Sequence, residues 1–114
     1  MVGSTKLRIS YRDRMVNYDL LEPDDKRVAQ GMSNTIEDDT RIVYEGTKIR
    51  KGVGGPEISE WVLQVGAGVS ASVIGNWIYD RLKDRDVEFL EIGGEQVEVD
   101  EESIQETLDK YTDD

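Results

Sequence analysis

The sequence of 114 residues contains no cysteine and no histidine. Without cysteine the chain can form no disulfide, no thiolate metal site and no cysteine nucleophile. Without histidine it lacks the commonest general base and the commonest ligand of transition metals. Carboxylates, lysine and tyrosine remain as catalytic groups, but no serine lies in a nucleophile motif. We therefore expect a protein that is not an enzyme and that holds no metal and no cofactor.

The chain also lacks a signal-peptide pattern, because its first residues contain no apolar run of the required length. We therefore expect a cytoplasmic protein. Its length is that of a single domain, residues 1–114, and can bury a core.

Basic side chains are scarce in the last part of the chain. The net charge is −11, and residues 86–114 contain twelve acidic side chains and one basic one. Because phosphate contacts require Lys and Arg, we expect no nucleic-acid partner. Two explanations of the acidity stay open: a solvated face that keeps the protein soluble, or a surface that binds a basic partner.

A modest basic patch lies in the neutral part of the chain. It could bind phosphate or an acidic partner, including the acidic end of a second copy, or it could simply be a solvated strand face. Its members are Arg41, Lys48, Arg50 and Lys51.

Residues 1–51 show the alternation of apolar and polar side chains that is typical of strands. The pattern predicts one β-hairpin over residues 5–21. A second strand, residues 41–51, is expected to turn back at Glu45-Gly46. Residues 52–56 are rich in glycine and proline and are expected to form a hinge.

Residues 86–114 predict an acidic hairpin followed by a helix. The strand of residues 86–92 shifts its apolar face near its middle, which indicates a bulge or burial on both faces. Gly93-Gly94 suits a two-residue turn, because glycine accepts a positive φ. Asp100 is expected to cap a C-terminal helix, with acidic residues at the positive end of its dipole.

Between these parts, residues 61–79 contain no charged side chain. They predict the middle of one long helix over residues 57–85, with Pro56 in its first turn. Acidic residues at its start and basic residues at its end match the helix dipole. The predicted fold is therefore α+β: short antiparallel β-hairpins packed on one long central α-helix, plus a short C-terminal helix. The charged residues that match the dipole of this predicted helix are Glu57, Glu60, Arg81, Lys83 and Arg85.

Such a helix would span about 43 Å, which exceeds the roughly 35 Å diameter of a domain of this size. Small side chains spaced along it would let another backbone approach closely. We therefore expect a small interaction protein, either a homo-oligomer or bound to a protein partner, that associates through this helix. An intramolecular role, in which the small residues let the helix lie flat on its own sheet, stays open. The predicted association face is Ala67, Gly68, Ala71, Ser72 and Gly75.

The same stretch resembles the fingerprint of a dinucleotide-binding βαβ unit over residues 61–92. Gly66, Gly68 and Ala71 match the pattern G-x-G-x-x-[GA], and Glu91 lies 25 residues after Gly66. The resemblance implies that these four residues bind a dinucleotide, with Glu91 on a ribose hydroxyl.

A membrane-active protein of the glycine-zipper toxin type is a third alternative. Nineteen uncharged residues are just long enough to span a bilayer, and aromatic side chains stand near both ends. Their modest hydropathy argues against permanent insertion, so we expect membrane contact only on meeting a target membrane.

Overall fold

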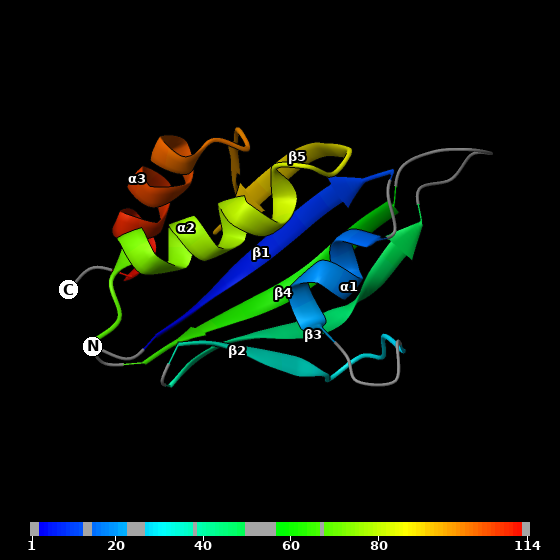
Figure 1. The fold of residues 1–114 in the computed structure, drawn as a ribbon, viewed down its shortest axis with the longest axis horizontal. Helices are drawn as coiled ribbons and strands as arrows, with labels where there is room; N and C mark the ends of the chain where they lie inside the picture. The colour runs from blue at the N-terminus through cyan, green and yellow to red at the C-terminus, as the bar shows by residue number, and fades with distance from the viewer. Residues whose placement is uncertain are drawn as a thin grey trace.

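The structure, a computed structural model, describes residues 3–12, 15–22, 27–37, 39–49, 57–66 and 68–112. In this part of the chain, six strands form one antiparallel sheet in the order β2-β3-β4-β1-β5-β6. The three helices lie over one face of this sheet (Figure 1). The elements are β1 (Gly3–Tyr11), α1 (Met15–Leu21), β2 (Ser33–Glu37), β3 (Thr40–Ile49), β4 (Glu57–Val65), α2 (Ala71–Leu82), β5 (Val87–Ile92), β6 (Glu95–Val97) and α3 (Glu101–Thr112).

The central strand, β1, defines the two faces of the sheet. Leu7, Ile9 and Tyr11 alternate along it and are at most 1% exposed, because they face the helices. We call this the inner face. Lys6 and Arg8 point the opposite way, as strand geometry requires, and we call their side the outer face.

Helices α2 and α3 cover β1 and β5 with apolar stripes at helical spacing. On α2 the stripe includes Ile74 and Ile78, and on α3 it includes Ile104 and Leu108, all fully buried. The prediction that Asp100 caps the last helix is confirmed, since its carboxylate accepts the backbone N–H of Ser103 at 3.0 Å.

Helix α1 packs against the other half of the inner face through Val16 and Leu20, both fully buried. Asn17 donates its side-chain N–H to the Tyr11 hydroxyl at 2.7 Å. Burial raises the pKa of Tyr11, because the phenolate would lose its hydration. This neutral buried pair fastens α1 to the end of β1.

The predicted long helix over residues 57–85 is wrong. Residues 57–65 form β4, and only 71–82 form a helix, α2, of 12 residues or about 18 Å. The helix cannot run through Gly68, whose φ is +85°, and it begins instead after Ser70, whose hydroxyl caps it. The fold prediction fails here because an antiparallel six-stranded sheet, with no long central helix among the described residues, organises the protein.

The predicted hairpin over residues 5–21 is also wrong, because β1 is followed by the helix α1. Strand β3 does not turn at Glu45-Gly46. It continues through a bulge there and pairs with β4 on both sides of it. The expected hinge, residues 52–56, lies outside the described residues.

The predicted hairpin in the acidic part of the chain is confirmed. Strands β5 and β6 flank Gly93 and Gly94, whose φ angles are +60° and +89°. The irregularity of β5 lies at Glu88, which is the extra residue where the register between β1 and β5 shifts. Phe89 and Leu90 then face opposite sides of the sheet, and each is at least partly buried.

Candidate functional sites

The residues predicted as an association face do not form one surface. Ala71 is buried at 6% exposure, and a side chain on Gly75 would meet Cγ of Gln105 on α3 at 2.7 Å. Gly68, in the loop before α2, and Ser72, in the first turn of α2, are both exposed. Ala67 lies outside the described residues. Two of the four described residues therefore serve the contact of α2 with the rest of the molecule.

The dinucleotide motif lies on a strand, a loop and a helix, as its pattern predicts. Strands β4 and β5 both run antiparallel to β1, so they are parallel to each other with β1 between them. Gly66 packs against Asp39, because a Cβ on it would lie 2.4 Å from the Asp39 Cβ, and its N–H donates to Thr40 Oγ1. The backbone and Cβ of Asp39 thus fill the space beside Gly66.

Glu91, the fourth residue of that motif, points to the other side of the sheet from the helix that follows the loop. It pairs with Arg8 in the sheet register and faces outwards, with 3.7 Å between its carboxylate and the Arg8 guanidinium. Helix α2 covers the inner face. The structure therefore brings Gly66, Gly68 and Ala71 together and leaves Glu91 on the opposite face.

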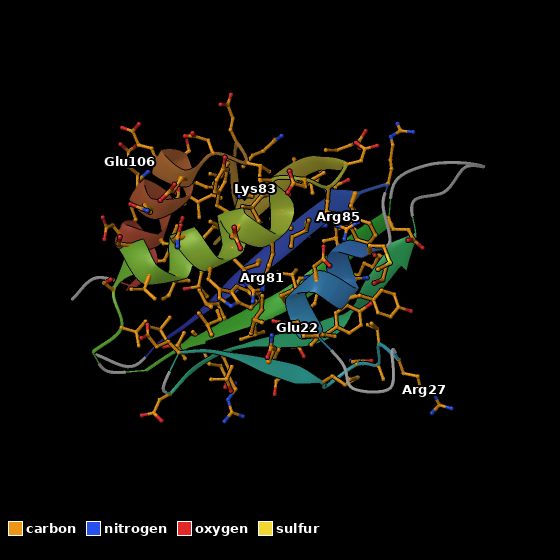
Figure 2. The ribbon with its side chains drawn as sticks, in the orientation of Figure 1. Glu22, Arg27, Arg81, Lys83, Arg85 and Glu106 are labelled. Atoms are coloured by element: carbon orange, nitrogen blue, oxygen red, sulfur yellow. The ribbon has the colours of Figure 1, made fainter. Side chains whose placement is uncertain are left out.

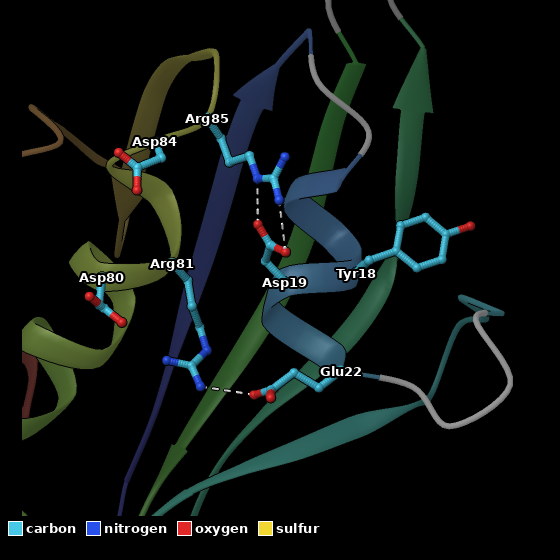
Figure 3. A pocket seen from close by; sticks show the side chains of 7 residues that line it. All are labelled: Tyr18, Asp19, Glu22, Asp80, Arg81, Asp84 and Arg85. Carbon is cyan, nitrogen blue, oxygen red and sulfur yellow. Dashed lines mark hydrogen bonds and ion pairs between the residues drawn. The ribbon is translucent and has the colours of Figure 1, made fainter.

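A polar cleft of about 360 Å³ separates α1 from the end of α2 (Figure 3). Arg85 holds Asp19 with two contacts, at 2.5 and 3.2 Å, and Arg81 holds Glu22 at 2.9 Å. Only the Arg85–Asp19 pair has two contacts, and bidentate pairs are among the stronger charged contacts. The lining residues are Tyr18, Asp19, Glu22, Asp80, Arg81, Asp84 and Arg85.

Arg81 also stacks on Trp77, with its guanidinium carbon 3.9 Å from the ring centroid. In Figure 2 its side chain points from α2 towards α1, where Glu22 lies. The hydrogen bond from Arg81 lowers the pKa of Glu22. Both arginines already bind carboxylates, at Asp19 of α1 and at Glu22 directly after it, so the cleft joins two helices and its lining offers no free positive group to an anion. From the sequence, both cations are expected only as partners of a helix dipole.

The outer face of the sheet has no described helix over it (Figure 1). Two apolar pairs lie on it by register: Val43 opposite Val62, and Ile58 and Phe89 on either side of Ser10. Ile58 and Ser10 are buried, and the other three side chains are partly buried. The outer face is thus a second, smaller apolar surface that the alternation of each strand produces.

Charged side chains of both signs surround these apolar pairs. Arg8 lies 3.7 Å from both Glu60 and Glu91, and Lys48 lies 3.5 Å from Glu60. A depression of about 120 Å³ opens between them. Five cations and four carboxylates lie on this face or at its bulges and strand ends, so its charge is close to neutral: Lys6, Arg8, Arg12, Arg41, Lys48, Glu45, Glu60, Glu88 and Glu91.

A groove of about 520 Å³ lies along the free edge of β5. Strand β6 pairs with residues 90–92 only, so the first half of β5 has β1 on one side and the groove on the other. We call this the edge groove. Its lining residues are Val87, Glu88, Phe89, Gln96, Val97, Glu98 and Val99.

Within the described residues, no group of three or more carboxylates is placed to hold a metal ion. The helices of this part of the chain are also too short, or too polar, to cross a membrane.

Comparisons with protein-family models, with curated proteins and with solved structures found no match to this chain.

Proposed function

We propose that the protein is a small non-enzymatic interaction protein that associates with a second copy through the outer face of its sheet. The observation that carries this proposal is a wide sheet face that is close to neutral, partly apolar and free of described helices. It replaces the small-residue face of α2, since Gly75 and Ala71 pack within the molecule.

Electrostatics favours this face over the other surfaces. Two copies that each carry a net charge of −11 repel each other, and the repulsion is strongest between acidic surfaces such as α3. The outer face carries both cations and carboxylates, which alternate in the row of Glu60, Arg8 and Glu91, so two such faces can meet without a net like-charge contact. The charged rows also allow ion pairs between copies when one sheet lies over the other.

The size of the face suits a stable dimer. The six strands contain 42 residues and, at about 3.3 Å per residue and about 4.8 Å between strands, cover roughly 700 Å². Standard interfaces bury about 800 Å² per partner. Val43 and Val62, directly opposite each other in the register, would lie near the centre of the contact. Two sheets pack face to face about 10 Å apart in such arrangements.

The test is the mass in solution, measured by light scattering over a range of concentrations. We expect the wild type to be a dimer and Val62→Lys to weaken the dimer about tenfold or more, because a lysine would be buried without a partner. Val73→Lys is the matched control, since Val73 is exposed on α2. Lys6→Glu, at an exposed position of the outer face, should weaken the dimer as well.

A monomeric wild type at high concentration would refute the proposal. So would a dimer that Val73→Lys disrupts and Val62→Lys does not, since that result would place the interface on α2. The cytoplasmic location stays a prediction from the sequence.

A further inference from the structure

We infer that the edge groove binds an extended, basic segment of a partner protein, which adds as a strand to β5. The first observation is the incomplete pairing of this edge. Strand β6 ends at Val97, and the chain then turns away, where the N–H of Asp100 bonds to the carbonyl of Glu98. On the side away from β1, residues 87–89 therefore have no strand of the described chain paired with them, although the N–H of Val87 already donates to the carbonyl of Arg85 at 3.0 Å. Strand addition uses such an edge for its main-chain hydrogen bonds.

Three valines form an apolar part of the groove lining, which we call its floor. Val87 and Val99 are partly buried and pack against the core, and Val97 is 7% exposed. Phe89 lies on the outer side of the same strand and is also only partly exposed. A partner strand would place alternate side chains on these two sides, so one set of its side chains would meet valine and the other would lie near the phenylalanine ring.

The rim of the groove is acidic. Glu98 is exposed. The carboxylate of Glu88 accepts a hydrogen bond from the Ser10 hydroxyl at 3.4 Å and forms an exposed ion pair with Arg12, also at 3.4 Å. Asp86 and Asp100 stand at the two ends of the lining segments and add to the negative charge. Lysine and arginine can lay their aliphatic stems on apolar surface while their charged ends reach carboxylates. A segment in which basic and β-branched residues alternate therefore fits both the floor and the rim.

A second copy of this chain does not offer such a segment at its described edges. Pairing two edge grooves would bring Glu88 and Glu98 of both copies together, which is repulsive. The edge strand at the other end of the sheet, β2, contains Glu37 and no basic residue. The basic strands β1 and β3 lie inside the sheet, with neighbours on both sides. Because neither described edge of a second copy offers a basic strand, we take the partner to be a different, basic protein.

The experiment uses the full chain and a short, capped, fluorescent peptide in which Lys and Val alternate. Binding is followed by fluorescence anisotropy and mapped by backbone amide shifts. We expect saturable binding, with the largest shifts in residues 87–89 and 97–99. A peptide with Glu in place of Lys should not bind. A peptide N-methylated along one edge should bind about tenfold more weakly, because it loses main-chain hydrogen bonds.

The matched protein variants are Glu98→Lys, in the groove, and Glu106→Lys, on α3. Figure 2 shows Glu106 projecting from α3, and its side chain is exposed. Glu98→Lys should weaken binding about tenfold, because it replaces one attraction by a repulsion. Glu106→Lys should change it less than twofold. Circular dichroism checks that both variants fold.

Absence of binding would overturn the inference. Equal losses in the two variants would also overturn it, since they would mean unspecific attraction to the acidic part of the chain, and so would shifts confined to β2. Glu88 and Phe89 belong to both surfaces, but Val62 lies only on the outer face and Glu98 is named only in the groove. The two proposals can therefore be separated: Val62→Lys should leave the peptide affinity unchanged, and Glu98→Lys should leave the mass unchanged.

Discussion

The substitution Gly75→Leu tests the contact between α2 and α3 that replaces the predicted association face. A Cβ at this position would lie 2.7 Å from Cγ of Gln105 and 3.4 Å from its Cα. An alanine needs only a turn of the Gln105 side chain, which costs about 0.5–1.5 kcal/mol. The gain in helix propensity over glycine is about 1 kcal/mol. Gly75→Ala should therefore change the free energy of unfolding by less than about 0.5 kcal/mol.

Leucine adds three further carbon atoms in the direction of the α3 backbone. Helix α3 cannot retreat without withdrawing Ile104 and Leu108 from the core, where both are fully buried. Overpacking of this kind costs about 1–3 kcal/mol. We therefore expect Gly75→Leu to destabilise the protein by about 2 kcal/mol.

Urea unfolding followed by circular dichroism measures this difference, at two protein concentrations. Ser72→Leu is the matched control, because Ser72 is exposed on α2, and it should change the stability by less than about 0.5 kcal/mol. A stability for Gly75→Leu equal to that of the wild type would refute the packing described here. A loss for Gly75→Leu that depends on protein concentration would place the glycine in an interface between copies.

Three further predictions concern other sites. Gly66→Ala should cost about 1–3 kcal/mol, since its Cβ would overlap Asp39 at the turn between β2 and β3; a neutral result in urea unfolding would mean that this turn is not packed as described. Gly68→Val should lower the melting temperature equally with and without NAD, because the cost of a positive φ, about 1–2 kcal/mol, does not involve a ligand; a rise of the wild-type melting temperature with NAD would support the dinucleotide alternative instead. The pKa of Glu22 is lowered by Arg81, so the pair stabilises the protein above pH 4.5 and loses this effect as the pH falls through the folded-state value. Glu22 is 56% exposed, which limits the effect to a few tenths of a kcal/mol. Glu22→Gln should be less stable than the wild type at pH 7 and equally stable in strong acid. If the variant were less stable by the same amount at both pH values, the loss would not come from the charge of Glu22.

The C-terminal part of the fold could be predicted because its signals are local. A glycine pair between two strands requires a turn, and Asp100 followed by acidic residues begins a helix whatever surrounds it. The same local rules apply in the structure, where Gly93 and Gly94 have positive φ and Asp100 caps α3.

The central stretch misled the prediction because two periodicities coincide in it. Val62 and Val65 belong to a helical stripe that continues to Val69, but Ser59, Trp61 and Leu63 alternate as a strand and are almost fully buried. The charges at Glu57 and Glu60, which fit the start of a helix, belong to a strand. Glu60 is bound there by cations of β1 and β3, which lie far away in the sequence. Such pairing depends on tertiary structure and leaves no local pattern.

The candidate sites were beyond sequence analysis for the same reason. The outer face and the edge groove exist only because six strands adopt one order and β6 is shorter than β5. The sequence did identify the acidity of residues 86–114 and named a basic partner as one explanation. It also identified Arg41 and Lys48, which the structure places on the outer face, whereas Arg50 and Lys51 lie outside the described residues.

The measurement that tests the central claim most directly is the response of valine methyl resonances to protein concentration. If two copies meet through the outer face, the methyl signals of Val62 and Val43 should shift together as the concentration rises. Those of Val73, on α2, should stay constant. Constant signals from Val62 and Val43 while the measured mass doubles would show that the copies meet elsewhere, and would contradict the account.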